Sequence, residues 1–239
     1  AVGFDLIRRR EEQLLQRALT RLNDHRNITV LGNLEAQRLS IVSFAVRRDG
    51  RYLHHNLVVA ILNDLFGIQS RGGCSCAGPY GHRLLGIDLE RSHEFEREIT
   101  GGCEGIKPGW VRINFNYFVS EPVFEYVVRA VALIADHGHK LAPQYCFDPM
   151  TGLWQHRAGP VEPPLRLTHL SYDADGLLTY PVEHDTAPES ALAGYLSEAV
   201  ALFDSLPDVI CEEGVGDRVS ADFEHLRWFD LPAECLEPS

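Results

Sequence analysis

Apolar residues recur three or four positions apart in several stretches of the chain, which is the spacing of a helix. Charged or polar residues stand between them, so each predicted helix has one face that must pack against another element. Gly67 follows one stretch and is a residue type that commonly ends a helix, while Ser120 precedes another and is a good N-cap. Helices are therefore predicted over residues 4–22, 55–66, 90–99 and 121–137.

Runs rich in β-branched residues lie between these helices and predict strands. Residues 28–31 and 38–46 are two such runs, separated by a turn. In residues 109–116, Val111 and its alternate neighbours are apolar, whereas Arg112 lies on the opposite face. This order of helices and strands predicts an α/β (α+β) layer sandwich with a small mixed or antiparallel sheet.

The C-terminal part of the chain differs in composition from the part before it. Residues 1–141 hold 18 Lys and Arg residues against 16 Asp and Glu, whereas residues 142–239 hold 4 against 18 and are rich in proline. In this acidic extension we predict a hairpin around 173–176, one helix over about 189–205, and an irregular tail over 207–239 that packs on the core. The chain is therefore divided into a first domain, 1–141, and an extension, 142–239.

The overall composition argues against several classes of function. A net charge of −12 disfavours nucleic-acid binding, because phosphate binding generally needs a basic surface. No apolar run approaches the roughly 18 residues that a membrane-spanning helix requires. The cysteines are scattered, and the chain opens on polar, arginine-rich sequence rather than an apolar secretion signal. We therefore expect a cytoplasmic protein with free thiols that binds neither nucleic acid nor membrane.

Two cysteines stand one residue apart in the stretch S-R-G-G-C-S-C-A-G-P-Y-G-H, residues 70–82. Arg71 places a positive charge near Cys74 and Cys76, two glycines let the backbone turn sharply, and Pro79 is suited to begin a short helix. Cysteines beside cations or at helix N-termini have pKa values lowered from about 8.5 to roughly 3.5–7.5, which makes a thiolate nucleophile. The residues alone leave three interpretations open: a reactive thiol, two ordinary small residues in a turn, or a Cys-x-Cys metal or redox site.

This loop resembles the active-site loop of the cysteine desulfurases and selenocysteine lyases among the class V aminotransferases. There an Arg-x-Gly-x-x-Cys-Ala-x-Pro pattern carries the catalytic cysteine, and here the pattern stands as Arg71, Gly73, Cys76, Ala77 and Pro79. The resemblance continues in order through the first helix, "RLSIVSFAV", "HHNLVVAILNDLFGI" and "VRINFNYFVSEPVFEYVVRAV". It covers about residues 1–140 and implies the C-terminal small domain of that family.

The resemblance implies a role for each candidate site residue. Cys76 corresponds to the nucleophile that accepts sulfur from an amino-acid substrate held on pyridoxal phosphate (PLP) and becomes a persulfide. Cys74 is a second candidate, because the family often has histidines between the glycine and the cysteine. Arg112 resembles the arginine that binds the substrate α-carboxylate, a task suited to its planar fork of donors. Arg71 is implied to assist anion binding or to stabilise the thiolate.

PLP catalysis needs a lysine that forms a Schiff base with the cofactor, and in this family that lysine lies in a larger N-terminal domain. The sequence has two lysines, Lys107 and Lys140, and neither stands in a setting that resembles the family's. We therefore expect the C-terminal part or a split subunit of such an enzyme, inactive without a partner cofactor domain. The apolar face of its first helix is expected to drive homodimerisation. The alternatives are a lysine-free protein-binding module or the Cys-x-Cys metal or redox site.

Overall fold

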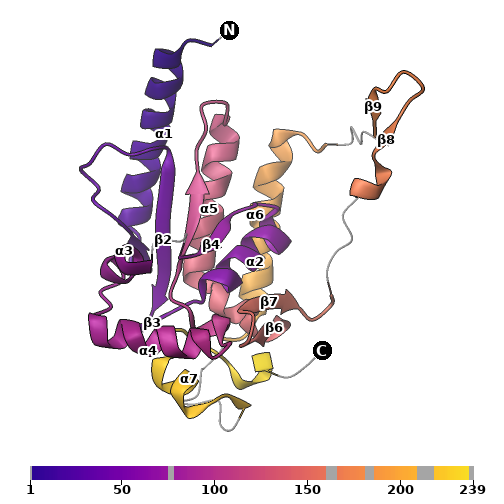
Figure 1. The fold of residues 1–239 in the computed structure, drawn as a ribbon. Helices are drawn as coiled ribbons and strands as arrows, with labels where there is room; N and C mark the ends of the chain where they lie inside the picture. The colour runs from indigo at the N-terminus through magenta and orange to yellow at the C-terminus, as the bar shows by residue number, and fades with distance from the viewer. Residues whose placement is uncertain (1, 75–77, 160–165, 181–185, 209–217, 237–239) are drawn as a thin grey trace.

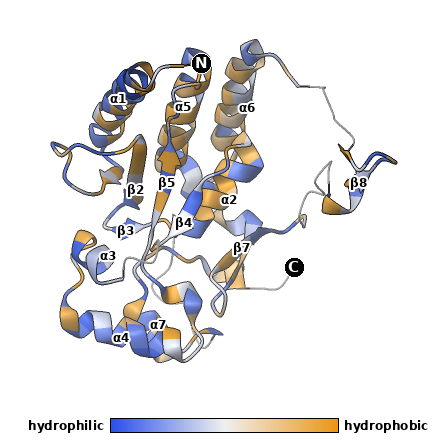
Figure 2. Cartoon of the chain, turned by 45° about the horizontal axis from the view of Figure 1, so that its top comes forward, coloured by the Kyte–Doolittle hydropathy of each residue, from blue (hydrophilic) through white to orange (hydrophobic). Residues whose placement is uncertain are grey.

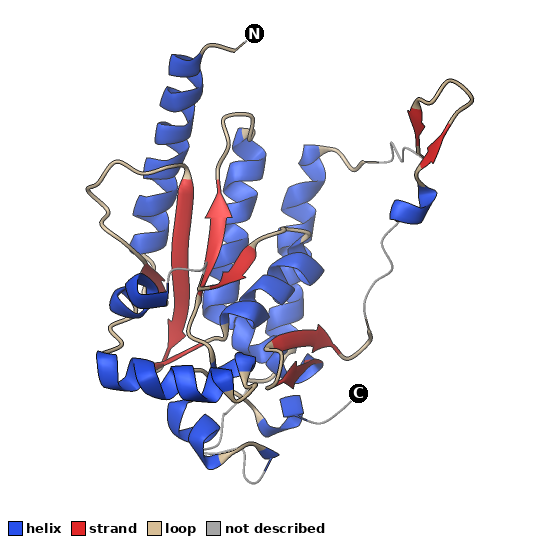
Figure 3. Cartoon of the chain, viewed as in Figure 1, coloured by secondary structure: helices blue, strands red, loops and turns tan. Residues whose placement is uncertain are grey.

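The structure of the protein is a computed structural model that describes residues 2–74, 78–159, 166–180, 186–208 and 218–236. In this part of the chain, antiparallel strands form a small sheet, and helices pack behind it (Figures 1 and 3). The architecture confirms the predicted α/β layer sandwich, including its antiparallel sheet.

The described helices and strands are interleaved through the first half of the chain. The α-helices are α1 (Phe4–Asn23), α2 (His55–Phe66), α3 (Gly78–Leu84), α4 (Leu89–Thr100), α5 (Glu121–His137), α6 (Leu192–Ser205) and α7 (Ala221–Leu226). Short 3-10 helices are η1 (Glu104–Ile106), η2 (Gly138–Gln144), η3 (Leu167–His169), η4 (Glu189–Ala191) and η6 (Ala233–Leu236). The strands are β1 (Ile28–Val30), β2 (Ile41–Arg48), β3 (Arg51–Tyr52), β4 (Arg71–Gly73), β5 (Trp110–Asn114), β6 (Tyr145–Asp148), β7 (Leu153–His156), β8 (Ser171–Tyr172) and β9 (Leu178–Thr179).

The main sheet has the strand order β1-β2-β5-β4, with β3 paired to β2 and every pairing antiparallel. Val42 and Phe44 of β2 and Val111 of β5 are almost completely buried on one face. They share a core with the buried residues of α1, α2 and α5. Figure 2 shows hydrophobic residues along α2, α5 and β5, whereas α1 is more polar because one of its sides faces solvent.

Helix ends follow local chemistry that the sequence already carries. Ser120 Oγ accepts a hydrogen bond of 3.3 Å from the backbone N–H of Val123, as expected of an N-cap. Gly67 ends α2 in the left-handed conformation, with φ of 64°. The predicted helix over 90–99 forms as α4, one residue longer at each end, because Asp88 accepts a hydrogen bond from Arg91 N–H and caps it.

The acidic extension packs on the same hydrophobic core as the first part of the chain. Phe147 and Trp154 of the β6–β7 hairpin, Phe203 of α6 and Phe223 of α7 are all buried in it. The predicted hairpin around 173–176 forms as β8 and β9, and it stands apart from the body in Figure 1. The division of the chain into two domains stays a prediction.

Three details of the extension differ from the sequence expectation. The tail that we expected to be irregular contains α7, which forms because Ser220 Oγ accepts a hydrogen bond of 3.0 Å from Phe223 N–H. The predicted helix over 189–205 begins as η4 and becomes α-helical at Leu192. The β6–β7 hairpin was not predicted, because its strands are only four residues long and carry few β-branched residues.

Candidate functional site

Polar side chains form one row across three strands of the sheet. Arg112 of β5 pairs with Ser43 of β2 on one side and with Arg71 of β4 on the other. The neighbouring pair, Gly72 and Val111, faces α2 and the core. Because side chains alternate along a strand, the two arginines lie on the opposite face of the sheet from α2. The strand prediction that placed Arg112 away from the core residues is confirmed.

The two arginines line a single pocket of about 560 Å³. Its walls come from the starts of β2 and β4, the end of β5, and α1. Most of the other polar groups that line it are neutral, and Glu11 of α1 is acidic. The lining residues are Glu11, Leu39, Ser40, Ile41, Gln69, Ser70, Arg71, Arg112, Ile113, Asn114 and Asn116.

Helix α1 brings Glu11 to this pocket through contacts with the segment that follows β5. A carboxylate oxygen of Glu11 accepts a hydrogen bond of 3.2 Å from the backbone N–H of Tyr117. Arg10 donates to the carbonyl oxygen of Val119 at 3.2 Å and to the carboxylate of Glu121 at 2.8 Å. These contacts hold α1 beside the pocket, so Glu11 is part of its wall.

The two glycines after Arg71 serve different purposes. At Gly72 a Cβ atom would lie 2.6 Å from Asn56 Oδ1 and 3.1 Å from the His55 ring, so β4 can approach α2 only without a side chain there. Gly73 has φ of 108°, a conformation that side chains of L-residues rarely adopt. The prediction of a sharp turn therefore holds at Gly73, whereas Gly72 permits a close contact between elements.

Of the two candidate cysteines, Cys74 lies within the described residues and Cys76 does not. Cys74 directly follows Gly73 and is a partly buried free thiol. Cys76, the predicted nucleophile, lies outside the described residues. The chain is described again from Gly78, where α3 begins, and a Cβ at Gly81 would lie 3.0 Å from the Trp110 ring. Helix α3 therefore packs on the arginine-bearing face of the sheet, against Trp110, which lies two residues along β5 from Arg112.

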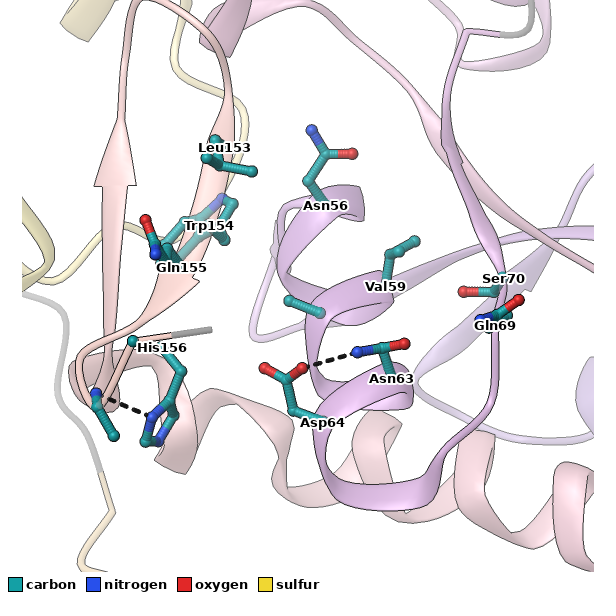
Figure 4. A pocket seen from close by; sticks show the side chains of 13 residues that line it. Asn56, Val59, Asn63, Asp64, Gln69, Ser70, Leu153, Trp154, Gln155 and His156 are labelled. Atoms are coloured by element: carbon teal, nitrogen blue, oxygen red, sulfur yellow. Dashed lines mark hydrogen bonds between the residues drawn. The ribbon is translucent and has the colours of Figure 1, made fainter. Parts of the chain in front are cut away.

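A second, larger pocket of about 920 Å³ lies between α2, the segment before β4, and the β6–β7 hairpin (Figure 4). In Figure 4, Asn56, Val59 and Asn63 stand on α2, and Leu153 to His156 form the opposite wall. Gln69 and Ser70 line this pocket and the arginine pocket, so one short segment separates the two. Ser70 Oγ is buried, and no described residue hydrogen-bonds to it.

Two adjacent histidines begin α2 and are held in their neutral forms. His54 Nδ1 accepts hydrogen bonds from the Trp154 indole at 3.0 Å and from Asn56 N–H at 3.2 Å, so Nε2 carries the proton and donates to Gly105 O at 3.1 Å. Burial, and then the neighbouring His55, holds the pKa of His54 well below 6.5. Burial, and then Lys107, lowers the pKa of His55 to about 3. The hydrogen bonds of His54 therefore link α2 to Trp154 and Gly105, whereas the His55 ring stacks on Trp228 with the centroids 5.8 Å apart.

His82 also has a partner that explains its position. Its Nδ1 lies 2.7 Å from Ser92 Oγ, which joins α3 to α4. Desolvation lowers the pKa of His82 below its usual value. None of His54, His55 and His82 lines the arginine pocket.

The two lysines of the chain are engaged away from the arginine pocket. Lys107 Nζ donates to Glu104 at 3.3 Å. Lys140 Nζ donates to the carbonyl oxygen of Phe203 at 3.2 Å and lies 3.8 Å from Asp208. Neither lysine lines that pocket.

The described part of the chain holds neither a cluster of metal-ligating side chains nor a membrane-spanning helix. Within it, no group of three or more His, Cys, Asp or Glu side chains is arranged to hold a metal ion. None of the helices described there combines the length and the apolar character needed to cross a membrane.

Sequence reasoning found Arg71 and Arg112 but missed other residues of their pocket. Strand alternation places Asn114 on the same face as Arg112, but it did not mark Asn114 as a pocket residue. Glu11 is one of many charged residues on α1, and nothing local marks it as a pocket residue. The link from His54 to Trp154 spans 100 positions and has no local sequence signal.

One protein family is similar in sequence to part of the chain. Residues 1–118 match the sequence model of the family Aminotransferase class-V, a stretch that includes Arg71, Cys76 and Arg112. No curated protein matches the sequence.

Proposed function

Because residues 1–118 match the class V aminotransferase family, we propose that this chain serves as the small domain of a PLP-dependent, cysteine-desulfurase-like enzyme. Enzymes of this family use PLP. One observation carries the proposal: Arg71 and Arg112 are paired across β4 and β5 and line one pocket. Two guanidinium groups that converge on a small pocket suit an amino-acid substrate, which must be held by its carboxylate.

In the part of the chain that the structure describes, neither lysine lies at the arginine pocket. The cofactor needs a lysine for its Schiff base, and Lys107 and Lys140 are bonded elsewhere, away from the arginine pocket. We therefore propose that another polypeptide segment supplies the lysine and the groups that hold the cofactor phosphate. When bound, PLP would supply the electron sink for chemistry at the substrate α-carbon.

In this proposal the chain contributes substrate binding and a sulfur acceptor. Arg112 binds the substrate α-carboxylate, because its fork of donors matches that group. Cys76 receives the substrate sulfur, and Cys74 is the alternative acceptor. The turn at Gly73 and the packing of α3 on Trp110 support a loop of defined path after β4.

The proposal is tested on the protein isolated, with any bound partner, from the cells that produce it. L-cysteine is added, sulfide is measured, and the cysteine peptides are examined by mass spectrometry. We expect a persulfide on Cys76 and loss of sulfide release in Cys76→Ser, whereas Cys74→Ser retains most of it. Arg112→Gln should raise KM at least about tenfold, because a charge-assisted bidentate contact is lost. Full sulfide release by Cys76→Ser would contradict the proposal.

The origin of the lysine needs a separate experiment. The purified 239-residue chain is incubated with PLP, reduced with borohydride and analysed by mass spectrometry. We expect no stoichiometric adduct on Lys107 or Lys140, because both are engaged away from the arginine pocket. A stoichiometric adduct together with sulfide release by the chain alone would show that it needs no second segment.

A further inference from the structure

The β8–β9 hairpin carries one apolar face. Tyr172 is opposite Leu178 in its register, and continuing this register toward the base of the hairpin places Leu170 opposite Tyr180. Because side chains alternate along a strand, these four side chains share one face, whereas Thr179 lies on the other. Antiparallel strands with this alternation commonly have the apolar face packed on a core and the polar face in water.

This apolar face is uncovered in the structure. Tyr172 and Tyr180 are 73% and 52% exposed, and Leu170 and Leu178 are 43% and 50% exposed. Figure 1 shows the hairpin standing apart from the main sheet and its helices. An isolated two-stranded hairpin is marginally stable at best in water. The face therefore lacks the packing partner that its pattern indicates.

The pocket of about 920 Å³ between α2 and β7, called the α2 pocket from here on, suits such a face. Val59 and Ala60 of α2 are apolar, and Gln69 and Gln155 stand on opposite sides of α2 (Figure 4). No described residue forms a hydrogen bond with either glutamine side chain. Tyrosine combines an apolar ring with a hydroxyl group that needs a hydrogen-bonding partner when buried. Apolar side chains flanked by free amide groups therefore match the two tyrosines of the hairpin.

The hairpin is connected to the chain beside this pocket. Gly159 lines the α2 pocket, and the chain is described again from Arg166, at the base of the hairpin. Residues 160–165 separate the two, and a connection of that length spans at most about 25 Å. So short a connection keeps the hairpin at a high effective concentration near the pocket. A contact of modest area can therefore form within one chain.

A second copy of the chain is a less suitable partner for this face. Residues 142–239 hold 4 Lys and Arg residues against 18 Asp and Glu, so the extensions of two copies repel each other. Association of two copies also loses translational and rotational freedom, a cost that a contact within one chain does not have. Charge and entropy both favour the contact within one chain.

We propose that the α2 pocket is the docking site of the β8–β9 hairpin of the same chain. The hairpin packs its apolar face on Val59 and Ala60, and the hydroxyl groups of Tyr172 and Tyr180 bond to amide groups of the pocket walls. The structure then describes the undocked arrangement. This inference does not depend on the proposed function, and its test needs no cofactor.

Photo-cross-linking shows where the apolar face packs. The variant Tyr172→p-benzoylphenylalanine of the 239-residue chain is purified and irradiated, and its cross-linked peptides are identified by mass spectrometry. We expect cross-links to α2 and β7, which form the pocket. The matched control, Thr179→p-benzoylphenylalanine, carries the same group on the opposite face and should give at least about fivefold fewer of them. Cross-links from position 172 to other elements alone, or none at all, would overturn the proposal.

A charge placed in the pocket should prevent docking. Ala60→Glu would put a carboxylate beneath the apolar face, so cross-linking from position 172 to β7 should fall at least about fivefold. Ala201→Glu adds the same residue at an exposed position of α6 outside the pocket and should leave the yield unchanged. Circular dichroism checks that both variants are folded. Unchanged cross-linking in folded Ala60→Glu would refute the site, and if this variant does not fold, the cross-linked positions decide by themselves.

Isotope labelling distinguishes docking within one chain from docking between copies. Labelled and unlabelled chains of the Tyr172→p-benzoylphenylalanine variant are mixed in equal amounts before irradiation. We expect each cross-link to join two peptides that carry the same label. Cross-links that join a labelled peptide to an unlabelled one in the statistical proportion would show docking on a second copy and would overturn the assignment to the same chain.

Discussion

The indole N–H of Trp154 donates a hydrogen bond of 3.0 Å to Nδ1 of His54, and both side chains are buried. His54 caps the N-terminus of α2 in the part of the chain that matches the family, whereas Trp154 lies on β7 in the acidic extension. The bond thus ties the extension to the helix that packs behind β4. This contact makes the stability of the first part depend on a residue in the second.

Replacing Trp154 with Phe should therefore destabilise the whole chain. The substitution keeps an aromatic ring but leaves one acceptor position of a buried histidine without its indole donor, at a cost of about 1–3 kcal/mol. The free energy of unfolding is measured by urea denaturation. The matched control is Leu153→Ala, since Leu153 is 57% exposed and its loss should change stability by less than about 0.5 kcal/mol. Equal stabilities for wild type and Trp154→Phe would show that the bond contributes nothing.

Stability should fall as the pH drops below about 6.5. The pKa of His55 is lowered to about 3 in the folded protein, so between pH 6.5 and 3 the unfolded chain binds a proton that the folded chain does not. The stabilisation is complete above pH 6.5 and is lost at about 1.4 kcal/mol per pH unit below it. His54, whose pKa is also lowered, adds to the same trend.

Urea denaturation at pH 7.5, 6.0 and 5.0 checks this pH dependence, because most carboxylates stay ionised over that range. His55→Gln should flatten the dependence while lowering stability at pH 7.5. The exposed His93 gives a control, and His93→Gln should leave the slope unchanged. A stability that does not change from pH 7.5 to 5.0 would contradict the neutral, buried state of both rings.

Self-association should depend on the beginning of α1. Phe4 and Leu6 are 77% and 57% exposed there, whereas Leu14 and the apolar residues that follow it on α1 are buried. The double variant Phe4→Ser/Leu6→Ser removes this apolar surface and should weaken homodimerisation at least about tenfold, given the area lost. Sedimentation velocity over a range of protein concentrations measures the change.

An exposed aromatic residue elsewhere provides the control for that experiment. Tyr172 on the β8–β9 hairpin is 73% exposed and lies in the extension. Tyr172→Ser should leave the association constant unchanged if α1 is the contact. A wild-type chain that stays monomeric at all concentrations would contradict the prediction of a homodimer.

Much of the secondary structure followed from the sequence because its causes are local. Ser120 caps α5 and Gly67 ends α2 through contacts within a few residues. The period of two along β5 separated Arg112 from Val111, whatever the strand's partners are. The loop pattern around Arg71 and Gly73 is also formed by residues close together in the sequence. The family resemblance could therefore be recognised from the sequence alone.

Only the tertiary structure decided which of these residues meet. Arg71 and Arg112 are 41 positions apart, and their pairing depends on the antiparallel register of β4 and β5. A shift of that register by one residue would place Arg71 opposite a core-facing position. The contact of Trp154 with His54 and the place of Glu11 in the pocket wall likewise come from packing between distant segments. Sequence therefore determined what each element is, because those interactions are local, and folding determined the site, because its geometry is set by long-range contacts.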